Sequence, residues 1–200
     1  MRLVFGEKDA PYEEARVVVL PVPYDLSLSF LPGARRGPEA ILLASRELEP
    51  FLLELGAAPE EVGIHAAEPV PWVAGMAEES HRLIREEALK HLRAGKWLVA
   101  LGGDHSVTHP LVQAHREALG EFSLLHVDAH ADLYPEWLGS VYSPPSPFYR
   151  PLTAGFPPVA VGIRGHGRLP VGGDHQRAAA QGRRRRRMVN HRPPVARCLP

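Results

Sequence analysis

Cysteine is almost absent from this sequence of 200 residues, since Cys198 is its only example. One cysteine cannot form an internal disulfide, so a disulfide-stapled fold is excluded and a reducing compartment, the cytoplasm, is expected. The sequence also lacks a run of 18 apolar residues and a signal-peptide core near its N-terminus. Neither a membrane span nor export is therefore predicted.

Acidic residues are scarce in the last third of the chain. Asp174 is the only acid after Glu136, whereas residues 137–200 contain 11 arginines. The formal net charge of +0 therefore combines an acidic part with a basic part. Five consecutive arginines at 183–187 could contact nucleic-acid phosphates. No aromatic residue is interleaved with them for base stacking, which favours a solvated, disordered tail over a nucleic-acid module.

The apolar residues that are present predict one α/β domain. Short continuous apolar runs at 17–20, at 97–101 and from Phe122 onward predict buried strands. A helical period over 76–92 predicts an amphipathic helix, and further helices are expected over 110–119 and from Pro38 to Leu55, the last of which Pro50 could kink or divide. Strand–helix–strand units with short connections place both strand ends at one edge of a parallel sheet.

Metal-binding residue types follow two of these predicted strands. Asp128, His130 and Asp132 are spaced by two, which in an extended chain puts all three side chains on one face. His105 lies in a Gly-Gly-Asp-His-Ser string after the other strand, at the same expected sheet edge, and is the natural fourth ligand. Carboxylates with imidazoles and no thiolate favour Mn²⁺, Fe²⁺ or Zn²⁺ over a structural cysteine–zinc site.

Other polar residues have plainer interpretations. Asp104 is interpreted as a turn residue or a support for the ligands, and His126 as a packed or supporting residue rather than a ligand. A second Gly-Gly-Asp-His string at 172–175 has no apolar strand before it and is interpreted as coincidence. The other histidines of the first two thirds are expected to be surface or helix residues: His65, His81, His91, His109 and His115.

Two motifs carry a family resemblance. Leu-Gly-Gly-Asp-His-Ser at 101–106 and Asp-Ala-His-Ala-Asp at 128–132, in this order and at this separation, resemble the ureohydrolase family of arginases, agmatinases and formiminoglutamases. The stretches at 21–25 and 32–41 resemble the bacterial agmatinase branch, and the resemblance runs to about Arg164. It implies a three-layer α-β-α fold with a parallel sheet, and hydrolysis of a linear guanidine such as agmatine to urea and an amine.

The same resemblance implies a pair of manganese ions. Asp128 would bridge the ions and hold the attacking hydroxide, His105 and Asp132 would bind one ion, and His130 the other. The implied partner is a small guanidine substrate in a homo-oligomer, a trimer or hexamer, without membrane or nucleic acid. One alternative is a relative that acts on another guanidino or a formimino compound. Another, outside the enzymes, is a non-catalytic metal-binding fragment.

The sequence departs from the family pattern in its second half. Pro144 stands where the family has a substrate-pocket histidine, and neither a Ser-x-Asp-x-Asp strand end nor a glutamate-bearing loop follows Arg164. We therefore predict an incomplete ureohydrolase-like domain over 1–164, with its C-terminal part missing, and a basic tail over 165–200. The tail is interpreted as disordered or out of frame, because the 20 arginines against 3 lysines are typical of a GC-rich gene. Impaired activity is expected.

Overall fold

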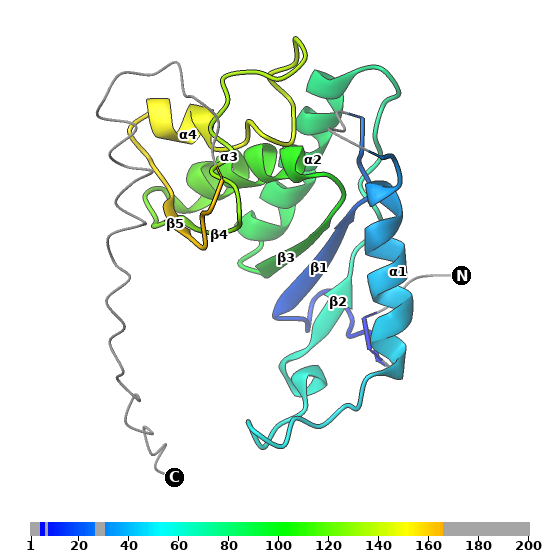
Figure 1. Cartoon of the computed structure of the whole chain (residues 1–200). Coiled ribbons are helices and arrows are strands. Elements are labelled where there is room, and N and C mark those ends of the chain that lie inside the picture. Colours follow the sequence, from blue (N-terminus) through cyan, green and yellow to red (C-terminus); the bar gives the residue numbers. More distant parts are fainter. Residues whose placement is uncertain (1–4, 7, 27–30, 166–200) are drawn as a thin grey trace, which may run out of the picture.

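The computed structural model describes residues 5–6, 8–26 and 31–165 (Figure 1). The predictions for the basic tail, for the string at 172–175 and for the arginine run lie outside these residues. The strands are β1 (Val17–Val22), β2 (Ile64–Ala66), β3 (Trp97–Gly102), β4 (Leu125–Val127) and β5 (Val159–Val161). The α-helices are α1 (Gly37–Ala44), α2 (Ala77–Arg93), α3 (Thr108–Leu119) and α4 (Tyr149–Thr153), and 3-10 turns lie at Ala34–Arg36, Ser45–Glu47, Pro59–Val62 and His105–Val107.

All pairings between the described strands are parallel, as predicted. One sheet has the order β2-β1-β3, with Val17 opposite Ile64 on one side and Trp97 on the other. A second sheet pairs β4 with β5, with Leu125 opposite Val159. The sequence predicted a single sheet. Among the described residues, however, β3 and β4 belong to different sheets.

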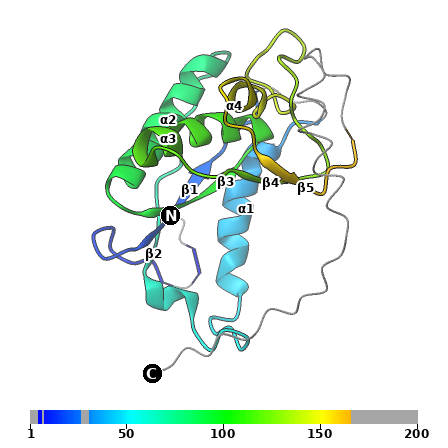
Figure 2. The same cartoon turned by 90° about the vertical axis from the view of Figure 1, so that its left-hand side faces the viewer.

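Helices cover both faces of β1, which gives the predicted three layers. Figures 1 and 2 show α2 and α3 on one side of the strands and α1 on the other. Alternate residues of β1 build the two cores: Val18 and Leu20 pack with Ile84 of α2, whereas Val19 packs with Leu42 of α1. Each such fully buried aliphatic side chain contributes roughly 1.5 to 3 kcal/mol.

The long helix α2 matches its prediction within one residue at each end. Its first turn carries Glu78 and Glu79 and its last turn Lys90 and Arg93, which is the favourable arrangement for the helix dipole. Ile84, Ala88 and Leu92 form its buried stripe. No helix among the described residues is long and apolar enough to cross a membrane.

The helix predicted from Pro38 to Leu55 is wrong in its second half. It ends at Ala44, where the Ser45 hydroxyl donates to the Leu42 carbonyl and accepts the Gly6 N–H. Leu48 is already extended, with ψ 141°, and Pro50 further disfavours helical conformation at Glu49, the residue before it. Leu48 and Leu55 are exposed.

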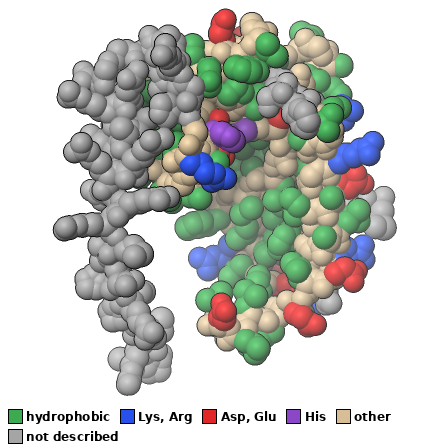
Figure 3. Space-filling model, in the orientation of Figure 1, with side chains coloured by type: hydrophobic (Ala, Val, Ile, Leu, Met, Phe, Trp, Pro, Cys, Tyr) green, Lys and Arg blue, Asp and Glu red, His purple; other side chains and the backbone are tan. Residues whose placement is uncertain are grey.

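The prediction of fully buried strands is also wrong for β3 and β4. Trp97 of β3 is 74% exposed, and Leu125 and Val127 of β4 are also mostly exposed. Leu98, which follows Trp97, and His126, which lies between Leu125 and Val127, face inward. Figure 3 shows hydrophobic side chains gathered over the strands on the face it presents. A continuous apolar run indicates burial on both faces, but the described residues leave Trp97, Val99, Leu125 and Val127 largely exposed, and on that face of β3 only Leu101 packs against the core.

Candidate metal centre

The candidate ligands lie where β3 and β4 end. His105 follows β3 in a 3-10 turn, His105–Val107, that leads into α3. Asp128 follows β4 directly. The segments that follow the two strands meet, as the distance of 2.8 Å between His105 Nδ1 and Asp132 Oδ2 shows. The predicted meeting of these strand ends therefore occurs, although the strands do not pair.

The turn that presents His105 depends on Gly103. Its φ is +49°, and an added Cβ would lie 2.5 Å from the Tyr24 carbonyl oxygen and 2.6 Å from that of Val22. The next residue donates its N–H to the same Tyr24 carbonyl at 2.7 Å. Only glycine fits this approach of two backbones, which ties the ligand-bearing turn to the end of β1.

Asp104 closes the turn, as its interpretation as a turn residue predicted. Its carboxylate accepts the Ser106 N–H at 2.9 Å and also the Ser106 hydroxyl. Because that hydroxyl proton is given to Asp104, the Ser106 oxygen is left to accept from His81 Nε2, 3.3 Å away. The buried chain Asp104, Ser106, His81 thus fixes the segment on either side of His105.

Four side chains form a compact group of potential ligands. His105, His126, Asp128 and Asp132 each offer one atom, and these atoms all lie within 4.8 Å of one another. His126 Nε2 is 3.8 Å from Asp128 Oδ2 and 4.0 Å from Asp132 Oδ2. Three predicted ligands, His105, Asp128 and Asp132, are therefore brought together, and His126 joins them.

His126 is the member that the sequence interpretation placed behind the ligands. Its side chain is 4% exposed, and its ring packs on Phe148 with centroids 4.1 Å apart. Neither ring nitrogen has a hydrogen-bond partner among the described residues. Burial and the nearby His105 lower its pKa, against the pull of Asp132 and Asp128. The imidazole is therefore neutral near pH 7, and its Nε2 lies within 4.0 Å of two carboxylates.

His130 lies at the rim of this group rather than inside it. Its side chain is 72% exposed, and its Nδ1 is 3.4 Å from Asp128 Oδ1. The prediction of one shared face assumed an extended chain, but the chain turns after Val127, and Asp132 has φ +49°. The period of two therefore does not extend through the motif.

Asp128 is held ionised by its surroundings. Partial burial raises its pKa, but the His130 N–H, which the carboxylate accepts at 2.7 Å, and the imidazoles of His105, His126 and His130 outweigh this and lower the pKa. Its own N–H donates to the Val161 carbonyl, so β5 holds the backbone. The residue is prepared as an anionic ligand near neutral pH.

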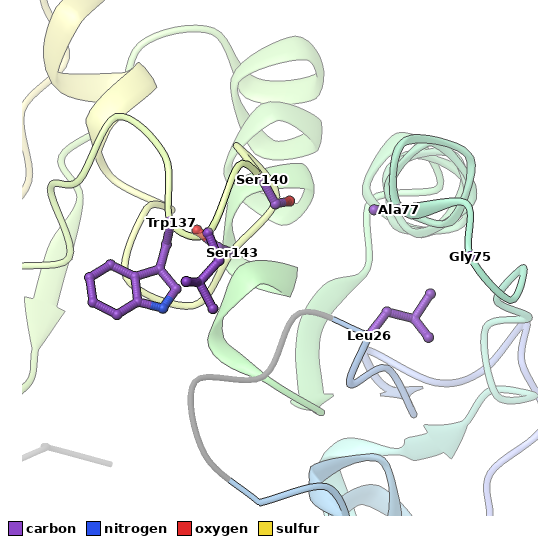
Figure 4. Close-up of a pocket in the computed structure, with 7 residues that line it drawn as sticks. Leu26, Gly75, Ala77, Trp137, Ser140 and Ser143 are labelled. Atoms are coloured by element: carbon purple, nitrogen blue, oxygen red, sulfur yellow. The ribbon is translucent and has the colours of Figure 1, made fainter.

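A pocket opens at the same end of the strands (Figure 4). Its walls come from the start of α2 and from loops that follow β1, β2 and β4. The lining residues are Leu26, Gly75, Ala77, Trp137, Leu138, Ser140 and Ser143. Pro144, which replaces the histidine expected by resemblance, is the next residue after Ser143. In parallel α/β sheets ligands bind at this edge, so the pocket is in a suitable place for a substrate.

His81, His91 and His109 lie on helices, as expected, but are buried there, whereas His65 is buried in β2 and lies neither on a helix nor at the surface. Burial, helped by the charges of His109 and Arg150, lowers the pKa of His81 to about 3. Burial and Arg150, whose Nη1 lies 3.2 Å from His109 Nε2, lower the pKa of His109 to about 4.

Comparison with known proteins identifies the class. The model of the arginase family matches residues 15–191, and the chain belongs to that family. Over 164 residues it is 96% identical to an N(1)-aminopropylagmatine ureohydrolase of Thermus thermophilus, a match that covers 82% of this chain and 56% of the relative. The agmatinase of Bacillus anthracis is 35% identical over 144 residues, covering 72% of this chain and 50% of the relative.

The fold has a solved counterpart. The proclavaminate amidino hydrolase from Streptomyces clavuligerus superposes with a TM-score of 0.73 at 26% identity, over 89% of this chain and 63% of that one. The recognition of the family and of an arginase-like α/β fold is therefore confirmed. The chain spans about half the length of the curated relatives it matches.

Proposed function

We propose that this chain carries the metal-binding part of an amidinohydrolase that splits an agmatine-type linear guanidine into urea and an amine. N(1)-aminopropylagmatine is the first candidate substrate. The observation that carries the proposal is the group of His105, His126, Asp128 and Asp132 at the carboxyl ends of parallel strands. The proposal is supported by the 96% identity over 164 residues to an N(1)-aminopropylagmatine ureohydrolase.

The donor set fits divalent metal ions, and we propose a manganese pair. Two carboxylates and imidazoles without thiolate favour Mn²⁺, Fe²⁺ or Zn²⁺, and the buried His126 Nε2 has no hydrogen-bond partner among the described residues. His105, Asp128 and Asp132 would hold the ions. When bound, such ions lower the pKa of a water molecule toward neutrality and so supply a nucleophile.

His130 is proposed as the ligand on the outer side. Its Nδ1 lies 3.4 Å from Oδ1 of Asp128, and its exposure leaves room for an ion beside it. His126 supports the site from the inner side, where Phe148 fixes its ring. The assignment separates the two histidines by side: His126 is packed and neutral, and His130 is free to turn toward a bound ion.

The two aspartates also act on the substrate. Their charge attracts a guanidinium cation to the group and partly neutralises the metal ions, so that the cation and the ions can share one site. Two carboxylates do not balance two dications, and further acidic groups would strengthen binding of the second ion. We expect the 200-residue chain to bind one ion, or two weakly, and to turn over at least about a thousandfold more slowly than a full-length relative.

The test compares Asp128→Asn with Glu121→Gln, which neutralises an exposed acid away from the group. Mn²⁺ binding by calorimetry should drop at least about tenfold for Asp128→Asn and stay unchanged for Glu121→Gln. Urea release is then measured with agmatine, arginine, guanidinobutyrate and N(1)-aminopropylagmatine side by side. Equal Mn²⁺ affinity in both variants would refute the site. Binding without any urea release would favour the non-catalytic metal-binding alternative.

A further inference from the structure

Phe148 lies where a loop that lines the pocket returns to the candidate metal centre. We call residues 132–148 the pocket loop. Its members that line the pocket are Trp137, Leu138, Ser140 and Ser143. Two backbone hydrogen bonds close this loop: the Phe148 N–H donates to the Asp132 carbonyl at 3.3 Å, and the Tyr134 N–H donates to the Pro145 carbonyl at 3.0 Å. The pocket loop therefore begins at a candidate ligand and ends beside it.

The ring of Phe148 packs on two histidines of the centre at once. Its centroid lies 4.1 Å from that of His126, with the ring planes tilted by 40°, and 5.7 Å from that of His105, in an edge-to-face arrangement at 73°. The two imidazole centroids are themselves 5.7 Å apart. His105 follows β3 and His126 belongs to β4, which lie in different sheets among the described residues. Phe148 thus links two histidines that strand pairing does not link.

These ring contacts bear on metal binding because an imidazole binds an ion only when its ring is correctly oriented. Neither ring nitrogen of His126 has a hydrogen-bond partner among the described residues, so hydrogen bonds within that part of the chain do not fix its plane. Its Nε2 lies 3.8 Å from Asp128 Oδ2 and 4.0 Å from Asp132 Oδ2, so a rotation of the ring would change the surroundings of both carboxylates. Packing on Phe148 holds the ring in one orientation.

Phe148 is itself held firmly. Its side chain is 2% exposed and packs with Ala131, Leu133 and Leu152. Two residues further on, in α4, the Arg150 guanidinium lies 3.2 Å from His109 Nε2 of α3 and 5.1 Å from the ring centroid of Tyr142 in the pocket loop. The segment is therefore tied to α3 and to the pocket loop, and its aromatic ring is a fixed surface for the two imidazoles.

We propose that Phe148 is a positioning residue of the metal centre, which fixes the imidazoles of His105 and His126 in the orientations that metal binding requires and joins the centre to the pocket loop. The inference rests on the proposed function, since it takes the centre to bind metal. Phe148 itself contacts neither ion nor substrate. Replacing a residue that orients metal ligands typically lowers metal affinity about 10- to 100-fold, and we expect a loss in this range.

The first test uses the unchanged 200-residue chain without metal. Protons near the face of an aromatic ring resonate upfield in NMR spectra. At about pH 8, above the ordinary pKa of histidine, the ring protons of His126 should therefore lie upfield of those of His130, which is 72% exposed. Phe148→Leu keeps an apolar side chain but removes the aromatic ring. It should abolish the upfield shift and weaken Mn²⁺ binding, measured by calorimetry, about 10- to 100-fold.

The matched control is Leu152→Ala, because Leu152 is buried in the same cluster as Phe148 but has no aromatic ring to pack on the imidazoles. It should destabilise the cluster while leaving the upfield shift and the Mn²⁺ affinity in place. The inference is overturned if the unchanged chain shows no upfield shift at His126, or if Phe148→Leu binds Mn²⁺ as tightly as Leu152→Ala. An unchanged chain that binds no Mn²⁺ refutes the proposed function. An upfield shift that Phe148→Leu removes and Leu152→Ala retains would still support the orienting contact.

Discussion

Replacing Gly103 by alanine should damage both the fold and the candidate metal centre. The new Cβ would lie 2.5 Å and 2.6 Å from two backbone carbonyl oxygens, of Tyr24 and Val22, and 3.0 Å from the Tyr24 nitrogen. Real Cβ contacts essentially never fall below 3.0 Å, and these neighbours are backbone atoms that cannot turn aside. The backbone of the turn must therefore move.

The magnitude has three parts. Alanine at φ +49° costs about 1 to 2 kcal/mol relative to glycine, and overpacking costs typically about 1 to 3 kcal/mol. Moving the turn also strains the hydrogen bond of 2.7 Å from the Asp104 N–H to the Tyr24 carbonyl, worth about 1 kcal/mol. The expected loss is roughly 3 to 6 kcal/mol in the free energy of unfolding, together with weaker Mn²⁺ binding through a displaced His105.

Gly95→Ala is the matched control. Gly95 also has positive φ, +73°, but nothing lies within 4 Å of an added Cβ, so only the conformational term of about 1 to 2 kcal/mol applies. Both variants are compared by urea unfolding and by Mn²⁺ calorimetry. Equal losses of stability in the two variants, with unchanged Mn²⁺ affinity in Gly103→Ala, would show that the close approach to β1 does not position the turn.

Two further predictions concern Lys96 and two buried imidazoles. Lys96→Met should lower the free energy of unfolding by about 2 to 3 kcal/mol, because the Lys96 ammonium donates to the carbonyls of Tyr12, Glu13 and Ala15. The control Lys90→Met should change it by about 0.5 kcal/mol or less, since only an exposed ion pair with Glu87 is lost. Equal losses in the two variants, measured by urea unfolding, would contradict this prediction. The free energy of unfolding should also decrease as the pH is lowered. The unfolded chain binds protons at these histidines below about pH 6.5, whereas in the folded chain buried His81 and His109 stay neutral down to their pKa values of about 3 and 4. Between pH 6.5 and 5 each of these two histidines contributes a loss of about 2 kcal/mol. Unfolding measured at both pH values should show a smaller decrease in stability for His81→Gln than for the unchanged chain. An equal decrease would contradict a buried, neutral His81.

Local sequence patterns predicted much of the fold. The period of α2 was readable because its apolar residues fall on one stripe and its charges suit the helix ends. Short strands followed by Gly, His and Asp indicated the edge at which His105, Asp128 and Asp132 meet, because parallel strands joined through a helix end on the same side. Asp104 was interpretable for the same reason, since an aspartate two residues before a serine N–H closes a turn locally.

Other features depended on contacts between distant segments. Pattern alone could not tell which histidine faces Asp128 from inside, because the turn after Val127 breaks the period that linked His130 to its neighbours. It could not predict the burial of His81 either, since that depends on Ser106 and Tyr142 arriving from other elements.

The sequence by itself thus determined the family, the α/β class and three of the residues grouped at the candidate centre, because these rest on motifs whose spacing acts within one strand–helix–strand unit. Only the tertiary structure decided that β3 and β4 stand in separate sheets, with Trp97 and Val127 in solvent. Strand pairing and burial are set by which other segments are present to supply hydrogen-bond partners and apolar contacts, and an apolar run specifies the need for such partners but not their identity.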